Sequence, residues 1–264
     1  MKPNTVKEKL KRGEPSVGTW LNLADPMSAR LMARVGFDWL TVEMEHTPVT
    51  FEHAATNFAL IAAGGTVPLV RVPWNTGENI KRVLDTGAWG IVVPMVNTRA
   101  EAEAVVYAAK YHPIGNRSVG GSLHAANFDT DPPTYYAAAN EQILIVLMIE
   151  HVEAIRNIEE ICAVPGIDVV FIGPNDLTKS MGKPPVFENS DPEFVEALER
   201  VLEAAKKHGV APGIHVADAP AARRRIDQGF QFVAITSEVG FLLSKAKEAL
   251  DFVGQGSTRE VARY

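Results

Sequence analysis

Short apolar segments alternate along the chain with longer segments of helical periodicity. Several of the short segments are apolar at consecutive positions, which is typical of parallel strands covered on both faces. The pattern predicts eight strands, at residues 17–23, 39–45, 68–73, 90–96, 143–150, 168–173, 211–216 and 232–238. It predicts helices at residues 26–35, 50–63, 77–86, 99–109, 152–162, 191–208, 217–228 and 239–253.

Eight strands alternating with helices over a chain of 264 residues predict a single (β/α)8 barrel domain. Its core is expected over about residues 16–253, with a polar tail at 254–264. The alternative is an open, doubly wound sheet, but the chain lacks the G-x-G-x-x-G motif after the first strand that would favour a nucleotide cofactor. The connection at 112–142 is longer than the others, which is typical of functional or partner-bound loops.

The composition fits a protein of a reducing compartment. The only cysteine, Cys162, cannot form a disulfide within the chain. The longest apolar run, residues 143–149, is far shorter than the roughly 20 residues of a membrane-spanning helix, and the first residues lack the apolar stretch of a signal peptide. The net charge of -6, without a basic cluster, disfavours nucleic acid. We therefore expect a cytoplasmic protein that binds neither membranes nor nucleic acid.

Candidate side chains lie near or just beyond the carboxyl ends of the predicted strands, the end of the barrel where catalytic residues lie. They include Trp20, Asn22, Glu45, His46, Arg71, Glu150, Asn175, Asp176, His215, Ser237 and Glu238. Glu150 and Asp176 follow neighbouring strands, so their charges would repel each other without a cation. Each alone fits a helix cap or a surface ion pair, but together they favour a hard divalent ion such as Mg²⁺ or Mn²⁺.

The other candidates leave more than one interpretation. Arg71 interrupts an apolar strand, so its guanidinium requires a carboxylate or an oxyanion. His46 fits a general base and a structural hydrogen bond equally well. Residues 174–177 resemble a helix start, whose N–H groups bind a substrate carboxylate or serve as a simple cap.

Two absences restrict the chemistry that the sequence predicts. No lysine lies at the end of a predicted strand, which disfavours a Schiff-base aldolase. No glycine-rich loop follows the seventh or eighth strand, which disfavours a sugar phosphate as substrate.

Six segments together resemble the HpcH/HpaI family of class II, metal-dependent pyruvate aldolases, and the resemblance extends over about residues 18–250. These segments are GFDWLTVEMEHTP (36–48), PLVRVPWN (68–75), IKRVLDTGAWGIVVPMV (80–96), NRSVGG (116–121), VLMIE (146–150) and IDVVFIGPNDL (167–177). The resemblance implies a barrel of the phosphoenolpyruvate/pyruvate-binding type. It also implies reversible cleavage of a 4-hydroxy-2-oxo acid to pyruvate and an aldehyde through a pyruvate enolate.

The resemblance also implies roles for individual residues. His46 would be the general base, with Asp85 raising its basicity, and Arg71 would stabilise the enolate. Glu150 and Asp176 would bind Mg²⁺ or Mn²⁺, with Co²⁺ as a further candidate. Substrate contacts are implied for Trp20 in the aldehyde pocket and for Arg71, Met148, Gly173, Asn175, Asp176 and His215, while Glu45 supports the site from outside.

Three positions depart from the family pattern. Met148 stands where the family usually has Gln beside the substrate, and Met44 replaces a usual Gly. His215 occupies a commonly apolar position that lines the aldehyde pocket. The resemblance therefore does not define which aldehyde this chain uses.

The resemblance further implies a homohexamer in which the last helix, at 239–253, packs on a neighbouring subunit. Asp85 lies near the C-terminal end of its predicted helix, which places it at the opposite end of the barrel from His46. We therefore expect Asp85 of one subunit to serve His46 of another.

Two alternative functions remain. The first is a lyase for CoA thioesters of the malyl-CoA or citramalyl-CoA type, but a basic site for the CoA phosphates is not evident. The second is a barrel that binds an oxo acid without turnover, which the combination of His46, Arg71, Glu150 and Asp176 disfavours.

Overall fold

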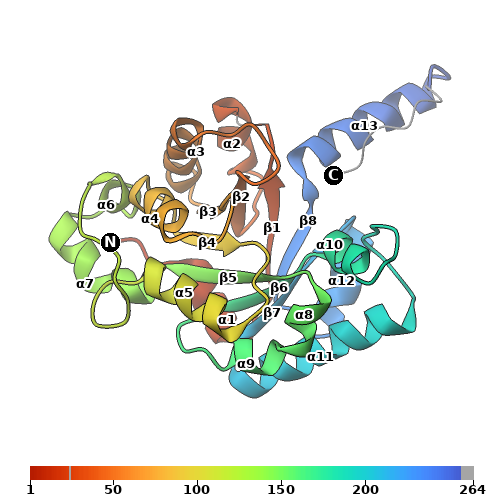
Figure 1. The fold of residues 1–264 in the computed structure, drawn as a ribbon. Helices are drawn as coiled ribbons and strands as arrows, with labels where there is room; N and C mark the ends of the chain where they lie inside the picture. The colour runs from red at the N-terminus through yellow and green to blue at the C-terminus, as the bar shows by residue number, and fades with distance from the viewer. Residues whose placement is uncertain (24, 257–264) are drawn as a thin grey trace.

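The eight predicted strands form one closed parallel barrel in the computed structural model, which describes residues 1–23 and 25–256 (Figure 1). Each strand pairs with the next, and the last pairs with the first. The strands are β1 (Ser16–Leu21), β2 (Trp39–Glu43), β3 (Val67–Arg71), β4 (Gly90–Val93), β5 (Leu144–Ile149), β6 (Val169–Ile172), β7 (Ala211–Val216) and β8 (Phe232–Ser237). The predicted (β/α)8 barrel is thus confirmed. Of the predicted tail, residues 257–264 lie outside the described residues.

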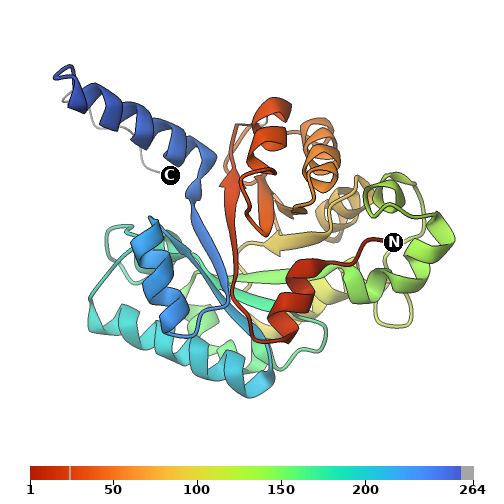
Figure 2. The same ribbon diagram turned by 180° about the vertical axis from the view of Figure 1, so that it is seen from behind.

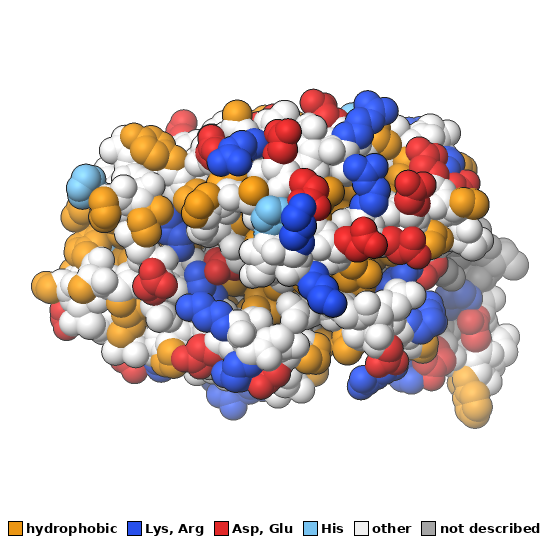
Figure 3. Space-filling model, turned by 90° about the horizontal axis from the view of Figure 1, so that it is seen from below, with side chains coloured by type: hydrophobic (Ala, Val, Ile, Leu, Met, Phe, Trp, Pro, Cys, Tyr) orange, Lys and Arg blue, Asp and Glu red, His pale blue; other side chains and the backbone are white. Residues whose placement is uncertain are grey.

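Helices surround the barrel, most of them where the apolar periodicity predicts. They are α2 (Pro26–Met32), α3 (Phe51–Ala63), α4 (Gly77–Asp85), α5 (Arg99–Ala109), α8 (Val152–Arg156), α9 (Ile158–Cys162), α10 (Pro174–Ser180), α11 (Pro192–His208), α12 (Ala219–Asp227) and α13 (Glu238–Phe252). Thr50 and Thr98 each begin a helix with a reciprocal capping box, which satisfies backbone N–H groups of the first turn. The face shown in Figure 3 carries interspersed acidic and basic side chains.

Four helices lie outside the predicted helical ranges. They are α10, of which only the start at residues 174–177 was predicted, and α1 (Thr5–Lys11), α6 (Leu123–Asn127) and α7 (Pro132–Gln142). The sequence of α1 is dominated by charged residues, so its apolar face is too narrow to show a helical period. Asn4 caps α1 and also donates to the carbonyl oxygens of Trp89 and Gln142. These contacts hold α1 at the end of the barrel where the strands begin (Figure 2).

The single helix predicted at 152–162 is instead two short helices, α8 and α9, that meet at Asn157. The Asn157 side chain donates to the carbonyl oxygen of Asn97 at 2.8 Å. Asparagine competes with regular helical hydrogen bonds through its side chain, and here that bond joins the break to the segment before α5.

Aromatic side chains fill the barrel interior. The rings of Trp39 and Phe232 stack with their centroids 4.1 Å apart, and Phe171 meets Phe232 edge-on at 5.7 Å. A Cβ atom at Gly18 would overlap the Trp39 ring, so only glycine allows this close approach. This packing closes the barrel below the carboxyl ends of the strands.

Two lysines converge on one backbone carbonyl near the start of β5. Lys7 and Lys110 each donate from Nζ to the carbonyl oxygen of Ile143 at 3.0 Å. Lys7 is paired with Asp168 at 2.8 Å, whereas the partners found for Lys110 within residues 1–23 and 25–256 are carbonyl groups. Burial, reinforced by the charge of Lys7, lowers the pKa of Lys110 to about 7.

Replacing Lys110 by Met is expected to change how stability depends on pH. Between pH 7 and the usual lysine pKa, the unfolded chain binds the proton that folded Lys110 gives up, so the wild-type free energy of unfolding rises with pH. From pH 7.5 to 9 the wild type should gain on the order of 2 kcal/mol relative to Lys110→Met. Urea unfolding at several pH values measures this difference. A constant difference would show that Lys110 does not titrate in that range.

The final helix, α13, extends away from the barrel in both views (Figures 1 and 2). Its exposed apolar side chains include Leu242, Leu250 and Phe252, the last of which is 92% exposed. Within the described part of the chain, no helix is both long enough and apolar enough to cross a membrane.

Candidate active site

The carboxyl ends of the strands surround a cavity of about 470 Å³. The residues that line it are Trp20, Asn22, Glu43, His46, Arg71, Met148, Glu150, Gly173, Pro174, Asn175, Asp176, Phe187, His215 and Ser237. They come from strands around the barrel and from the turns that follow. The structure therefore brings together most of the predicted site residues at the expected end of the barrel.

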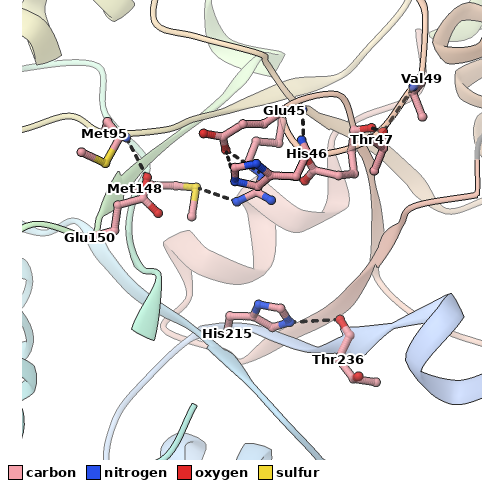
Figure 4. A network of polar contacts seen from close by, with 11 residues as sticks. Glu45, His46, Thr47, Val49, Met95, Met148, Glu150, His215 and Thr236 are labelled. Atoms are coloured by element: carbon pink, nitrogen blue, oxygen red, sulfur yellow. Dashed lines mark hydrogen bonds and ion pairs between the residues drawn. The ribbon is translucent and has the colours of Figure 1, made fainter. Parts of the chain in front are cut away.

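Arg71 is the last residue of β3, and its guanidinium is almost surrounded by acceptors. Nε donates to Glu43 Oε2 at 2.5 Å and lies 3.2 Å from Glu45 Oε2. Nη1 donates to the Met148 sulfur at 3.6 Å, so this methionine still gives Arg71 a weak acceptor (Figure 4). The Arg71 Cζ atom lies 4.6 Å from the centroid of the Trp20 ring, a cation–π distance. Burial alone would lower the pKa of Arg71, but the carboxylates of Glu43, Glu45 and Glu150 raise it above its usual value. The guanidinium therefore stays protonated.

Glu43 is buried at the end of β2, directly beside Arg71 in the barrel register. One carboxylate oxygen accepts from Arg71, and the other accepts from the backbone N–H groups of Glu45 and His46 at 2.7 and 3.0 Å. This single carboxylate therefore holds both the guanidinium and the turn that carries His46. Glu43 was not predicted as a site residue, although a carboxylate in an apolar strand beside the strand of Arg71 indicates a partner for that guanidinium.

His46 lies in the turn after β2, and its side chain is 53% exposed. Its Nε2 atom is 3.6 Å from Glu45 Oε2, and the side chain borders the cavity (Figure 4). Glu45 itself is 12% exposed and bridges His46 and Arg71. Burial raises the pKa of Glu45, and the nearby Arg71 charge opposes that shift.

Glu150 directly follows β5 and is buried. Its Oε1 accepts from the backbone N–H of Met95 at 2.8 Å, where the Met95 backbone has a positive φ of 53°. Burial raises the pKa of Glu150 to about 8, while Arg71 opposes this shift. A carboxylate in this environment is stabilised by a nearby cation.

Gly173 and Asp176 complete this side of the cavity at the start of α10. A Cβ atom on Gly173 would lie 2.6 Å from Glu150 Oε2, so a side chain there would occupy the space beside the carboxylate. Asp176 lies in the first turn of α10, and within residues 1–23 and 25–256 its carboxylate has no hydrogen bond or ion pair. No group of three or more His, Cys, Asp or Glu suited to a metal is found in the described chain. Glu150 and Asp176 both line the cavity. Two carboxylates beside such a cavity fit an ion such as Mg²⁺, which keeps water and substrate oxygens as its other ligands.

A protein-family model for "HpcH/HpaI aldolase/citrate lyase" matches residues 16–244. The chain belongs to this family. A 4-hydroxy-2-oxo-heptane-1,7-dioate aldolase of Shigella sonnei (strain Ss046) is 39% identical over 94% of this chain and 93% of its own length. These similarities confirm the predicted family and the expectation of a carbon–carbon lyase.

Two solved structures of the family share the fold of this chain. A family protein from Burkholderia cenocepacia J2315 has a TM-score of 0.88 at 34% identity, with 95% of this chain and 99% of the other covered. An HpcH/HpaI aldolase from Desulfitobacterium hafniense DCB-2 has a TM-score of 0.87 at 31% identity, covering 97% and 98%. The barrel described above is therefore the barrel of this family.

Asp85, to which a role beside His46 was assigned, lies outside the cavity. It ends α4, and its side chain is 28% exposed. Its Oδ1 pairs with Nη2 of the fully buried Arg117 side chain at 2.7 Å. Asp85 therefore lies near the start of β4, whereas His46 lies at the ends of the strands, and the role predicted for Asp85 requires a second subunit.

Phe187 is a second residue of the cavity that the sequence did not reveal. It comes from the connection between α10 and α11, and its ring meets the His215 ring edge-on at 4.8 Å. A lone aromatic residue in a loop belongs to no period, so its position could not be inferred.

Replacing Glu43 by Gln is expected to destabilise the protein and to impair catalysis. Gln keeps the shape but removes a buried charge that accepts from three N–H groups, so we expect a loss of about 2–4 kcal/mol in the free energy of unfolding. Because Arg71 and the His46 turn lose their common anchor, kcat should fall by roughly 10- to 100-fold. Urea unfolding and turnover measure both effects, with Glu45→Gln as the matched control at a more exposed carboxylate. Equal stability losses in the two variants would contradict the anchoring role of Glu43.

Proposed function

We propose that this chain catalyses the reversible cleavage of a 4-hydroxy-2-oxo acid to pyruvate and an aldehyde. The observation that carries the proposal is the Arg71 guanidinium, which is fixed by Glu43 and Glu45 and lies in one cavity with Glu150, Asp176 and His46. A preorganised cation of this kind stabilises the negative oxygen of an enolate. The relative from Shigella sonnei, named as an aldolase for a 4-hydroxy-2-oxo diacid, supports the same reaction class.

Different residues of the cavity would bind the substrate carboxylate, stabilise the enolate and transfer the proton. The backbone N–H groups of Asn175 and Asp176, which donate to no acceptor within residues 1–23 and 25–256, would bind the carboxylate of the oxo acid. Arg71 would stabilise the oxygen that becomes negative when the carbon–carbon bond breaks. His46, exposed at the edge of the cavity, would take the proton of the C4 hydroxyl as the C3–C4 bond breaks, which leaves the aldehyde and the enolate. Uptake of one proton at the methylene carbon of the enolate then gives pyruvate, and addition runs through the same steps in reverse.

Glu150 and Asp176 would hold a divalent cation, either Mg²⁺ or Mn²⁺ and with Co²⁺ as a further candidate. Such an ion would supply Lewis-acid stabilisation of negative charge on the oxo acid. The free Asp176 carboxylate, the buried Glu150 and the space kept by Gly173 support this assignment.

Pyruvate release from two substrates tests the proposed reaction against a thioester lyase. Purified protein with added Mn²⁺ or Mg²⁺ is assayed with 4-hydroxy-2-oxoheptanedioate and, separately, with malyl-CoA or citramalyl-CoA. We expect pyruvate from the free acid and no cleavage of the thioesters. Cleavage of a thioester alone would overturn the proposal in favour of a CoA-dependent lyase.

We further propose that the protein acts as a homohexamer in which neighbouring subunits complete each site. The exposed apolar side chains of α13, which projects from its own barrel, support packing against a second copy (Figure 1). The distance in the fold between Asp85 and His46 supports a contribution of Asp85 from that copy.

Mixed inactive variants test the shared site. His46→Ala and Asp85→Ala proteins should each be nearly inactive, whereas subunit exchange between them should restore part of the activity through hybrid interfaces with one intact His46–Asp85 pair. Exchange is verified by native mass spectrometry, which also reports the oligomeric state. Absence of recovery after verified exchange would overturn the shared site, and a monomer would overturn the oligomer.

A further inference from the structure

The His215 ring is fixed in the wall of the cavity by aromatic neighbours. His215 belongs to β7, and its ring centroid lies 5.6 Å from that of Trp20 and 4.8 Å from that of Phe187. The Phe187 ring is nearly perpendicular to it, at 81°. These contacts on two sides leave the ring little rotational freedom.

One hydrogen bond determines which nitrogen of His215 carries the proton. Nε2 lies 3.0 Å from the carbonyl oxygen of Thr236, and because a carbonyl only accepts, Nε2 must donate. The Thr236 backbone has a positive φ of 40°, which is costly for a β-branched residue. Burial lowers the pKa of His215 to about 3, and the Arg71 charge acts in the same direction. The ring is therefore neutral, and Nδ1 carries a lone pair.

Nδ1 is an acceptor available to a ligand. Its edge of the ring faces the side on which Met148 and His46 lie (Figure 4). In the described part of the chain, no donor binds Nδ1. The adjoining wall is formed by the rings of Trp20 and Phe187, so an apolar ligand group placed against His215 would leave this acceptor unpaired.

We propose that His215 is a specificity-determining residue that selects short aldehydes carrying a hydroxyl group, which donates to Nδ1. The inference rests on the proposed aldolase function and names the class of its second substrate. A site built to bond a hydroxyl rejects the analogue that lacks it, because its own polar atom then stays unpaired. Hydroxylated two- and three-carbon aldehydes are small enough for a cavity of about 470 Å³ that also holds pyruvate.

The test compares glycolaldehyde with propanal, which has the same number of heavy atoms and a methyl group in place of the hydroxyl. Addition of pyruvate to each aldehyde is measured with Mn²⁺, and kcat/KM is expressed per free aldehyde. The wild type should favour glycolaldehyde by about tenfold or more. The preference is a ratio within one protein, so a general loss of activity cancels.

Two variants separate the acceptor from the volume of the side chain. His215→Leu removes Nδ1 and should reduce the preference to about unity, while His215→Asn keeps an acceptor on a short side chain and should retain a several-fold preference. A wild type without a preference for glycolaldehyde would overturn the inference. A preference in His215→Leu equal to that of the wild type would also overturn it.

The proposed function fails in a different way. If it is wrong, the wild type adds pyruvate to neither aldehyde and does not exchange the methyl protons of pyruvate with solvent. Proton exchange together with an unchanged preference in His215→Leu would contradict only the role of His215.

Discussion

Replacing Arg71 by Lys is expected to lower kcat by about 10³-fold in both directions of the reaction. The ammonium group of lysine retains the charge, but its three N–H donors share one nitrogen atom, whereas the guanidinium spreads its donors over three nitrogens. The lysine therefore cannot donate to Glu43 and Met148 and also face the substrate. The same loss should appear in pyruvate proton exchange, because stabilisation of the enolate is the step that Arg71 serves.

Arg82→Lys is the matched control for this experiment. Arg82 lies on α4, where its guanidinium covers the Phe51 ring at 4.0 Å and its side chain is 52% exposed. Its replacement should leave kcat within about twofold of the wild type, since surface substitutions of this kind have small effects. An Arg71→Lys variant with more than a tenth of wild-type activity would contradict the central role of that guanidinium.

Replacing Glu150 by Gln is expected to weaken Mn²⁺ binding by at least about 100-fold, since changes even to the partners of metal ligands cost 10- to 100-fold. The neutral amide keeps the shape of Glu150 and can still accept from the Met95 N–H, so the fold should persist. Electron paramagnetic resonance of free Mn²⁺ measures the affinity without any turnover.

Glu196→Gln serves as the control for metal binding, since Glu196 is exposed on α11. Its Mn²⁺ affinity should equal that of the wild type. If Glu150→Gln also binds Mn²⁺ as tightly as the wild type, the ion does not use this carboxylate.

The sequence predicts the barrel because eight short apolar segments alternate with segments of helical periodicity. The prediction of helices fails where a helix buries only a few residues, or where a single side-chain contact interrupts the helix. The helix α1 buries Val6 and Lys7 in a mostly charged segment, and the break at Asn157 depends on a hydrogen bond to a segment distant in the chain. Neither feature changes a periodic pattern, so both needed the structure.

Charge at the end of an apolar strand is the sequence feature that separates the predicted site residues from most of those that were missed. Arg71 ends β3 and Glu150 directly follows β5, so both are charged residues at the end of an apolar strand. A charged residue at such a position needs a partner or a function. Glu43 meets the same criterion, but the predicted strand continued past it to residue 45, which hid its position at the strand end. Phe187 carries no charge and lies in a loop, so only the folded chain shows that it covers His215.

The position of Asp85 relative to His46 could be predicted from the direction of its helix. Its place at the C-terminal end of α4 predicts separation from His46, and the structure agrees, because Asp85 pairs with Arg117 outside the cavity. Whether a second copy brings another Asp85 to His46 depends on contacts between chains, which the sequence of one chain does not encode in any local pattern.

The methyl protons of pyruvate offer the most direct test of the central claim, that this cavity forms and stabilises a pyruvate enolate. Protein, pyruvate and Mn²⁺ in heavy water are followed by proton nuclear magnetic resonance without any aldehyde. We predict loss of the methyl signal with the wild type, dependence of that loss on the divalent ion, and no loss above background with Arg71→Lys. A methyl signal that persists with the wild type under Mn²⁺, Mg²⁺ and Co²⁺ would contradict the account.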